Sequence, residues 1–176
     1  MSTIAGCALM ASVIGLQIVG GPLYDFYGIR PDFPAIALAT IALTLRPGAA
    51  IAVAVLAGAA LDISSAGVAG THMTACLGLV FFVLRGRKTG WDEDRTGRAL
   101  LSTGGILIAV LPPHLMSWAL DGRPLNSAIL FAGTAGYTIL FAWPLHRLLR
   151  PTLEWFVSPG QRPGLLLGRA SWQRRA

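Results

Sequence analysis

The side chains that could do chemistry in this sequence are few, and three of them lie in or beside apolar runs. Asp62 ends a run of small and apolar residues, His72 follows the next turn, and His114 lies inside another apolar run. A carboxylate and an imidazole at one depth of a membrane can pass a proton or bind a ligand. For Asp62 we favour a structural interpretation, in which its oxygens cap the next helix or organise the turn. For both histidines we favour a hydrogen bond to a neighbouring helix.

No spacing of residues indicates catalysis or a metal site. The sequence has no Ser/His/Asp set, no HExxH motif and no phosphate-binding loop. Cys7 and Cys76 lie in apolar runs without ligand spacing, so we expect buried thiols. The acids Asp92, Glu93 and Asp94 form a cluster that we interpret as a solvated loop. We therefore expect no enzyme activity, no metal and no cofactor.

The composition indicates the environment in which these residues must be held. Of 176 residues, 54% are hydrophobic and only 12% are charged, and the mean hydropathy is +0.63. A soluble domain usually has about 25% charged residues. We therefore expect an all-α integral membrane protein, a compact helical bundle with short loops. The longest loop, residues 85–98, leaves no room for a catalytic domain in water.

The apolar runs predict six membrane spans. A bilayer core of about 30 Å needs about 20 helical residues. The expected spans cover residues 4–23, 33–45, 49–61, 67–84, 99–120 and 125–148. We take the first as a retained span rather than a cleaved signal peptide. Residues 1–149 would form the bundle, and residues 150–176 a basic cytoplasmic tail.

The second and third spans are short and could instead form one helix, which would give five spans. Pro47 would then lie at the helix centre, where proline costs about 3 kcal/mol or more. Arg46 beside it would add about 2.5–3.5 kcal/mol. We favour two helices joined by a tight turn.

The basic residues predict the orientation. With six spans and a cytoplasmic N-terminus, all of the 14 Lys and Arg except Arg30 and Arg123 lie on the cytoplasmic side. This is the positive-inside pattern. Five spans with the N-terminus outside fit the rule about as well, and both models place residues 85–98 and the C-terminus in the cytoplasm. The net charge of +6 thus reflects membrane topology, and we expect lipid rather than nucleic acid as a partner.

Small residues mark faces where helices could approach closely. Ala50, Ala54 and Gly58 recur every fourth residue and lead to Asp62. We expect this ridge to pack against a neighbouring helix. We also expect Asp62→Asn to insert normally but to weaken assembly with a partner.

The last two spans have three further features. Pro112 and Pro113 predict a kink in the fifth span. Ala132 and Gly136 form a second close-approach face in the sixth span. His146 follows a Trp-Pro pair and precedes an arginine, which we interpret as anchoring at the membrane interface.

Over about residues 28–85, the order of these features resembles the rod shape-determining protein MreD family. The matching pieces are Arg30-Pro31-Asp32-Phe33, Leu45-Arg46-Pro47-Gly48, Ala57-Gly58, Leu61-Asp62, Ser64-Ser65 and Gly67. The resemblance implies a non-enzymatic scaffold of the cell-elongation machinery in the bacterial inner membrane. It also implies a periplasmic MreC-like partner, proximity to the actin-like MreB system and a role in organising peptidoglycan synthases.

Together, the residue patterns and the resemblance give a set of structural or interaction candidates. These are Pro31, Asp32, Arg46, Ala50, Ala54, Gly58, Asp62, Gly67, His72 and His114.

The alternative function is the substrate-binding membrane subunit of an energy-coupling-factor vitamin transporter. Such a subunit needs a ligand pocket near the outer face, to which His114, Trp118 and Asp121 could contribute. A sizeable outer pocket containing His114 would reject the scaffold, whereas a closed, dry interior near Asp62 would favour it.

Overall fold

The computed structural model describes residues 2–65, 68–121 and 124–156, and in these ranges it has six α-helices and no strand. The elements are α1 (Ser2–Gly20), the 3₁₀ helix η1 (Gly21–Tyr24), α2 (Phe33–Thr44), α3 (Pro47–Ser64), α4 (Thr71–Lys88), α5 (Arg95–Asp121) and α6 (Pro124–Phe156). The expected all-α class is confirmed. Gly67 and residues 157–176, which include most of the expected tail, lie outside the described residues.

Four segments are long and apolar enough to cross a membrane. They are Thr3–Tyr24, Pro47–Ser64, Arg95–Leu120 and Ala128–Leu153. By length and composition the chain therefore fits a multi-pass membrane protein. The expectation of six full spans holds only for these four, because α2 has 12 residues and α4 carries three basic residues in its last turn. A 12-residue helix is about 18 Å long, well short of the bilayer core.

The segment from residue 33 to 64 forms two helices, as predicted, and the single-helix alternative is wrong. The backbone leaves the helical region at Leu45 (φ −86°, ψ 169°) and stays extended at Arg46 (φ −65°, ψ 147°). Pro47 then begins α3, where its missing N–H costs nothing. Pro112 and Pro113 behave differently, since both lie inside α5, which continues through them.

Helix α2 is the centre of the bundle. It contacts each of the other five α-helices, and those five contact one another in the order α1, α3, α4, α5, α6 and back to α1. All ten residues from Phe33 to Ala42 are buried. A helix that is apolar on every face needs such an all-round cover. The five helices around α2 expose large apolar side chains outward, such as Leu16, Leu56 and Leu140, which suits contact with lipid.

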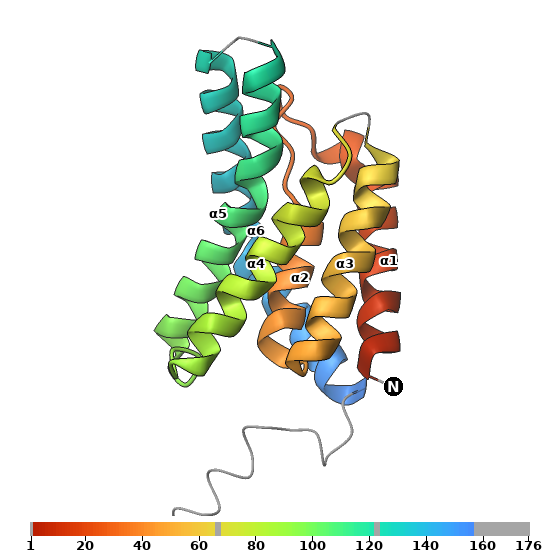
Figure 1. The fold of residues 1–176 in the computed structure, drawn as a ribbon, viewed down its shortest axis with the longest axis vertical. Coiled ribbons are helices and arrows are strands. Elements are labelled where there is room, and N and C mark those ends of the chain that lie inside the picture. The colour runs from red at the N-terminus through yellow and green to blue at the C-terminus, as the bar shows by residue number, and fades with distance from the viewer. Residues whose placement is uncertain (1, 66–67, 122–123, 157–176) are drawn as a thin grey trace, which may run out of the picture.

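The bundle has two ends with different chemistry (Figure 1). One end, at the top of Figure 1, carries the segment between α1 and α2 and the end of α3, and we call it the Asp62 end. The other, at the bottom, carries the α2–α3 turn with Arg46 and the α4–α5 turn, and we call it the basic end. The first residues of α1 also lie at the basic end.

Candidate functional site

The carboxylate of Asp62, in the last turn of α3, caps the N-terminus of α4. Its Oδ2 accepts hydrogen bonds from the backbone N–H of Gly70 (3.0 Å) and of Met73 (3.2 Å), and its Oδ1 from that of His72 (2.9 Å). The first N–H groups of a helix have no partner within it. Gly70 occupies the N-cap position with φ 88° and has no side chain to offer. Asp62 therefore supplies the cap from the preceding helix, in agreement with the structural interpretation.

The imidazole of His72 lies against the same carboxylate. Its Nδ1 is 3.2 Å from Asp62 Oδ1, and the two side chains are 28% and 10% exposed. In the neutral ring this contact places the proton on Nδ1, which leaves Nε2 as an acceptor. The structure thus brings together the two groups that sequence reasoning singled out at this corner.

The small-residue ridge of α3 packs inside the chain. Ala50 and Ala54 have no exposed surface. At Gly58 the backbone of α4 comes so close that a Cβ would overlap the backbone of Met73. The ridge therefore packs inside the bundle, as predicted, and at Gly58 the neighbouring helix is α4 of the same chain. The ridge is therefore not a free face for a partner. The expectation that Asp62→Asn weakens assembly with a partner depended on such a face, so it loses its basis.

A second acid, Asp32, caps the central helix α2. Its Oδ1 accepts the N–H of Ala35 at 3.0 Å, and its own N–H donates to Thr138 Oγ1 of α6 at 2.9 Å. The amide of Gln17 in α1 donates to the carbonyl of Pro31 at 2.9 Å. Sequence reasoning missed Gln17 and Thr138, although a lone amide in an apolar helix was a usable signal.

The other end of α2 is held by Arg87 of α4. Its Nη1 donates to the carbonyls of Ala42 (2.7 Å) and Leu45 (2.8 Å), which lack partners at the helix end. Its Nε lies 3.5 Å from Asp92 Oδ2. Arg46, which we expected to matter here, is exposed and makes no capping hydrogen bond with its side chain.

His146 is not an interfacial anchor, and that prediction is wrong. Its Nδ1 lies 2.9 Å from Thr40 Oγ1 of α2, and its Nε2 lies 2.8 Å from Ser102 Oγ of α5. Thr40 already donates its hydroxyl proton to the carbonyl of Ile36 at 2.8 Å. The ring therefore donates from Nδ1 to Thr40, and its two contacts tie α6 to α2 and α5. The next residue, Arg147, instead stacks on the Trp143 ring, with its Cζ 4.6 Å from the ring centroid.

A cavity of about 240 Å³ lies between the α1–α2 segment and helices α1, α3, α4, α5 and α6. Its polar lining comprises Gln17, Arg30, Asp32, His72, His114 and Thr134. The His114 ring packs edge-on against Phe131 (centroids 5.8 Å apart). Its nitrogens have no hydrogen-bond partner among the described residues, so the expected bond to a neighbouring helix is not formed. The interior near Asp62 is thus not closed. The cavity contains His114, as the transporter alternative requires.

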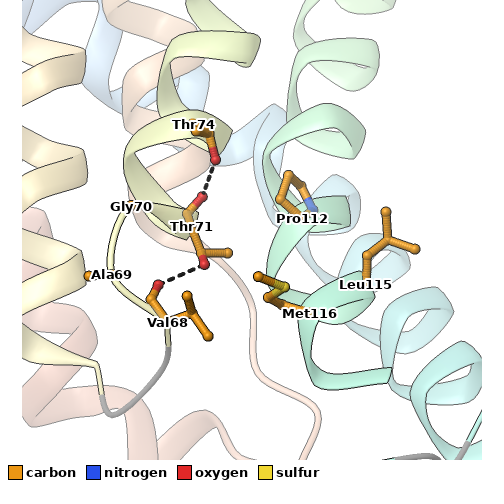
Figure 2. Close-up of a pocket in the computed structure, with 8 residues that line it drawn as sticks. All are labelled: Val68, Ala69, Gly70, Thr71, Thr74, Pro112, Leu115 and Met116. Carbon is orange, nitrogen blue, oxygen red and sulfur yellow. Dashed lines mark hydrogen bonds between the residues drawn. The ribbon is translucent and has the colours of Figure 1, made fainter. Parts of the chain in front are cut away.

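A second, more open groove of about 470 Å³ lies between the start of α4 and the proline pair of α5 (Figure 2). Figure 2 shows that the hydroxyls of Thr71 and Thr74 each bond to the residue three positions earlier in the chain. They donate to the carbonyls of Val68 (2.7 Å) and Thr71 (2.8 Å). Opposite them lie Pro112 and Met116, so the groove offers mainly apolar surface.

The remaining expectations concern metals and the outer end of α5. Within residues 2–65, 68–121 and 124–156, no group of three His, Cys, Asp or Glu could hold a metal ion. Trp118 is 49% exposed and does not line the cavity, and the side chain of Asp121 lies outside the described part.

No protein-family profile, no curated protein and no solved structure matches this chain.

Proposed function

We propose that this chain is a non-enzymatic membrane scaffold of the bacterial cell-elongation machinery, as its resemblance to the MreD family implies. One observation carries the proposal: the acids of the resembling segment are used to build the fold. Asp32 caps α2 and Asp62 caps α4, while Gly58 permits close contact with α4. A protein whose partly buried acids hold helix ends has few groups left for chemistry.

In this proposal all six helices lie in the bacterial inner membrane. The short α2 is covered by its neighbours and needs no lipid contact along its length. The basic end, with Arg85, Arg87 and Lys88 in the last turn of α4, faces the cytoplasm by the positive-inside rule. The C-terminus lies on the same side.

A partner's membrane-spanning helix would dock on α6. Ala132 and Gly136 are exposed, and nothing lies within 4 Å of a Cβ added at Gly136. Small residues on a lipid-facing helix allow another backbone to approach closely. The partner implied by the resemblance is an MreC-like periplasmic shape protein.

A pull-down from native membranes tests this proposal. The full chain should recover a shape protein, and Gly136→Leu should reduce that recovery because leucine fills the close-approach face. Gly15→Leu on α1 is the matched control, since Gly15 is also exposed with nothing within 4 Å. Equal recovery with both variants would argue against docking on α6, and recovery of no elongation protein would reject the function.

The second candidate, a substrate-binding transporter subunit, is favoured by the cavity that contains His114. Its 240 Å³ is below the roughly 300–1,000 Å³ usual for ligand pockets, which is why we place this candidate second. Recovery of ATPase subunits in the same pull-down, instead of shape proteins, would reverse the order.

A further inference from the structure

The one cationic side chain that lines the cavity at the Asp62 end, Arg30, is already paired with an acid. The guanidinium of Arg30 donates from Nε to Asp25 Oδ2 at 2.8 Å, and its Nη2 contacts the same oxygen. The amide of Gln17 donates to the Pro31 carbonyl, and its oxygen accepts the N–H of Phe33 at 3.3 Å. The Arg30 charge is thus balanced by Asp25, and both polar atoms of the Gln17 amide have a backbone partner.

Three side chains of the cavity offer acceptors that could meet a cation. The partly buried carboxylate of Asp32 accepts one N–H at Oδ1 and pairs with no cation among the described residues. His72 has its Nδ1 engaged with Asp62, so its Nε2 is an acceptor in the neutral ring. His114 has no hydrogen-bond partner in the described part of the chain and adds a further imidazole nitrogen. A partly buried carboxylate without a paired cation is stabilised by a cation that also donates hydrogen bonds.

We propose that this cavity binds a primary ammonium group, held by the Asp32 carboxylate and by the imidazoles of His72 and His114. An ammonium has three N–H donors and one positive charge, which match these acceptors. The 240 Å³ volume holds a group of the size of ethanolammonium with some water. The inference does not depend on the scaffold proposal.

Two sources can supply this chemistry: a phospholipid headgroup or a free amine. His72 and Pro113 line the cavity, whereas their chain neighbours Thr71 and Pro112 line the apolar groove of Figure 2. The two hollows are thus neighbours, as the headgroup and acyl chain of a lipid require. The experiment needs an arm for each source.

The first arm measures lipid retention by native mass spectrometry of the full chain, purified in detergent with equal phosphatidylethanolamine and phosphatidylcholine. The second arm measures thermal unfolding in ethanolammonium chloride against tetramethylammonium chloride, which has no N–H donor. We expect about a tenfold preference for the primary amine, as for a charge-assisted hydrogen bond. A preference in the first arm alone identifies a lipid, and in the second alone a free amine. No preference in either arm overturns the proposal.

Variants then locate the site. Asp32→Asn keeps an N-cap oxygen for α2 but removes the charge, so the protein should fold and lose the preference. Asp94→Asn, which removes a charge at the basic end, is the matched control and should keep it. His114→Phe retains the packing on Phe131 and should weaken the preference. If Asp32→Asn and His114→Phe both keep the wild-type preference, the cavity is not the site.

Discussion

A carboxylate at the end of an apolar helix can act as an acid, a ligand or a cap, and the groups that face it decide among these roles. Asp62 faces three backbone N–H groups of α4 and one imidazole nitrogen. Backbone N–H groups do not give up protons, so most of the hydrogen-bonding capacity of this carboxylate serves structure. In these bonds, His72 is the one neighbour that contacts the Asp62 carboxylate through its side chain.

Asp62→Ala should lower the free energy of unfolding by about 2–4 kcal/mol, because buried N–H groups lose their acceptor. His72→Phe should cost less, since it removes only the ring contact and keeps the capped backbone N–H of residue 72. Thermal unfolding of the purified protein in detergent measures both. Ser64→Ala is the control, as the Ser64 hydroxyl bonds only to its own helix at Ala60. A smaller effect for Asp62→Ala than for His72→Phe would contradict the capping role.

The turn after η1 has a pH-sensitive ion pair. The hydrogen bond from the Arg30 side chain, followed by that from the Gly28 N–H, lowers the pKa of Asp25 below its usual 3.8. A lowered pKa means that this contribution to stability is present above 3.8 and is lost as the pH falls through the folded-state pKa. Asp25→Asn should therefore melt at a lower temperature than wild type at pH 6, and the difference should vanish in strong acid. A difference that grows as the pH falls would have the wrong sign.

The central helix α2 illustrates how an element too short to span a membrane is held in place. Asp32 caps its N-terminus and Arg87 its C-terminus, so opposite charges meet the two ends of the helix dipole. Each cap reduces the cost of burying unpaired backbone groups in an apolar surrounding.

Arg87→Met keeps the apolar stem but leaves the carbonyls of Ala42 and Leu45 without this donor. We expect a loss of about 1–3 kcal/mol in the free energy of unfolding. Arg85→Met is the matched control, because Arg85 is exposed on the same turn of α4. Equal melting temperatures for the two variants would show that Arg87 does not cap α2.

Contact between α3 and α4 depends on one missing side chain. Gly58→Ala places a methyl group against the Met73 backbone, which must move, so we expect a loss of about 1–3 kcal/mol. Gly48→Ala, in the first turn of α3, meets nothing within 4 Å and should be neutral or raise stability by up to about 1 kcal/mol. Thermal unfolding of the pair separates helix contact from helix propensity. If Gly48→Ala lowered stability as much as Gly58→Ala, the loss at Gly58 could not be assigned to contact with α4.

Local patterns predicted the features of this fold that depend on neighbouring residues in the chain. The break at Pro47 and the cap by Asp62 each follow from a short stretch of sequence. The positions of α2 and His146 do not, because they depend on partners in distant helices. His146 has a tryptophan and an arginine nearby, which favoured an interface, but its partners Thr40 and Ser102 lie 106 and 44 residues away. The Arg87 cap was missed for the same reason, since its acceptors lie more than 40 residues earlier.

At the scale of the whole molecule, the charges divide the bundle into two chemically different ends. The basic end carries the exposed Arg46 and the basic last turn of α4, while the Asp62 end has Arg30 neutralised by Asp25. By the positive-inside rule, we expect the basic end to face the cytoplasm.

Cysteine labelling in intact cells tests this orientation. In a background of Cys7→Ser and Cys76→Ala, Tyr27→Cys reports on the Asp62 end and Thr89→Cys on the basic end. A maleimide that cannot cross membranes should label the Tyr27→Cys protein in intact cells, and the Thr89→Cys protein only after permeabilisation. Val80→Cys, at a position with no exposed surface, should stay unlabelled in both and thereby control for unfolding. Labelling of both end variants in intact cells would put the two ends on one side of the membrane. A bundle that crosses the bilayer has its ends on opposite sides, so this result would contradict a membrane-spanning bundle. Labelling of Thr89→Cys alone would reverse the orientation and, with it, the leaflet whose headgroups can reach the cavity beside Asp32.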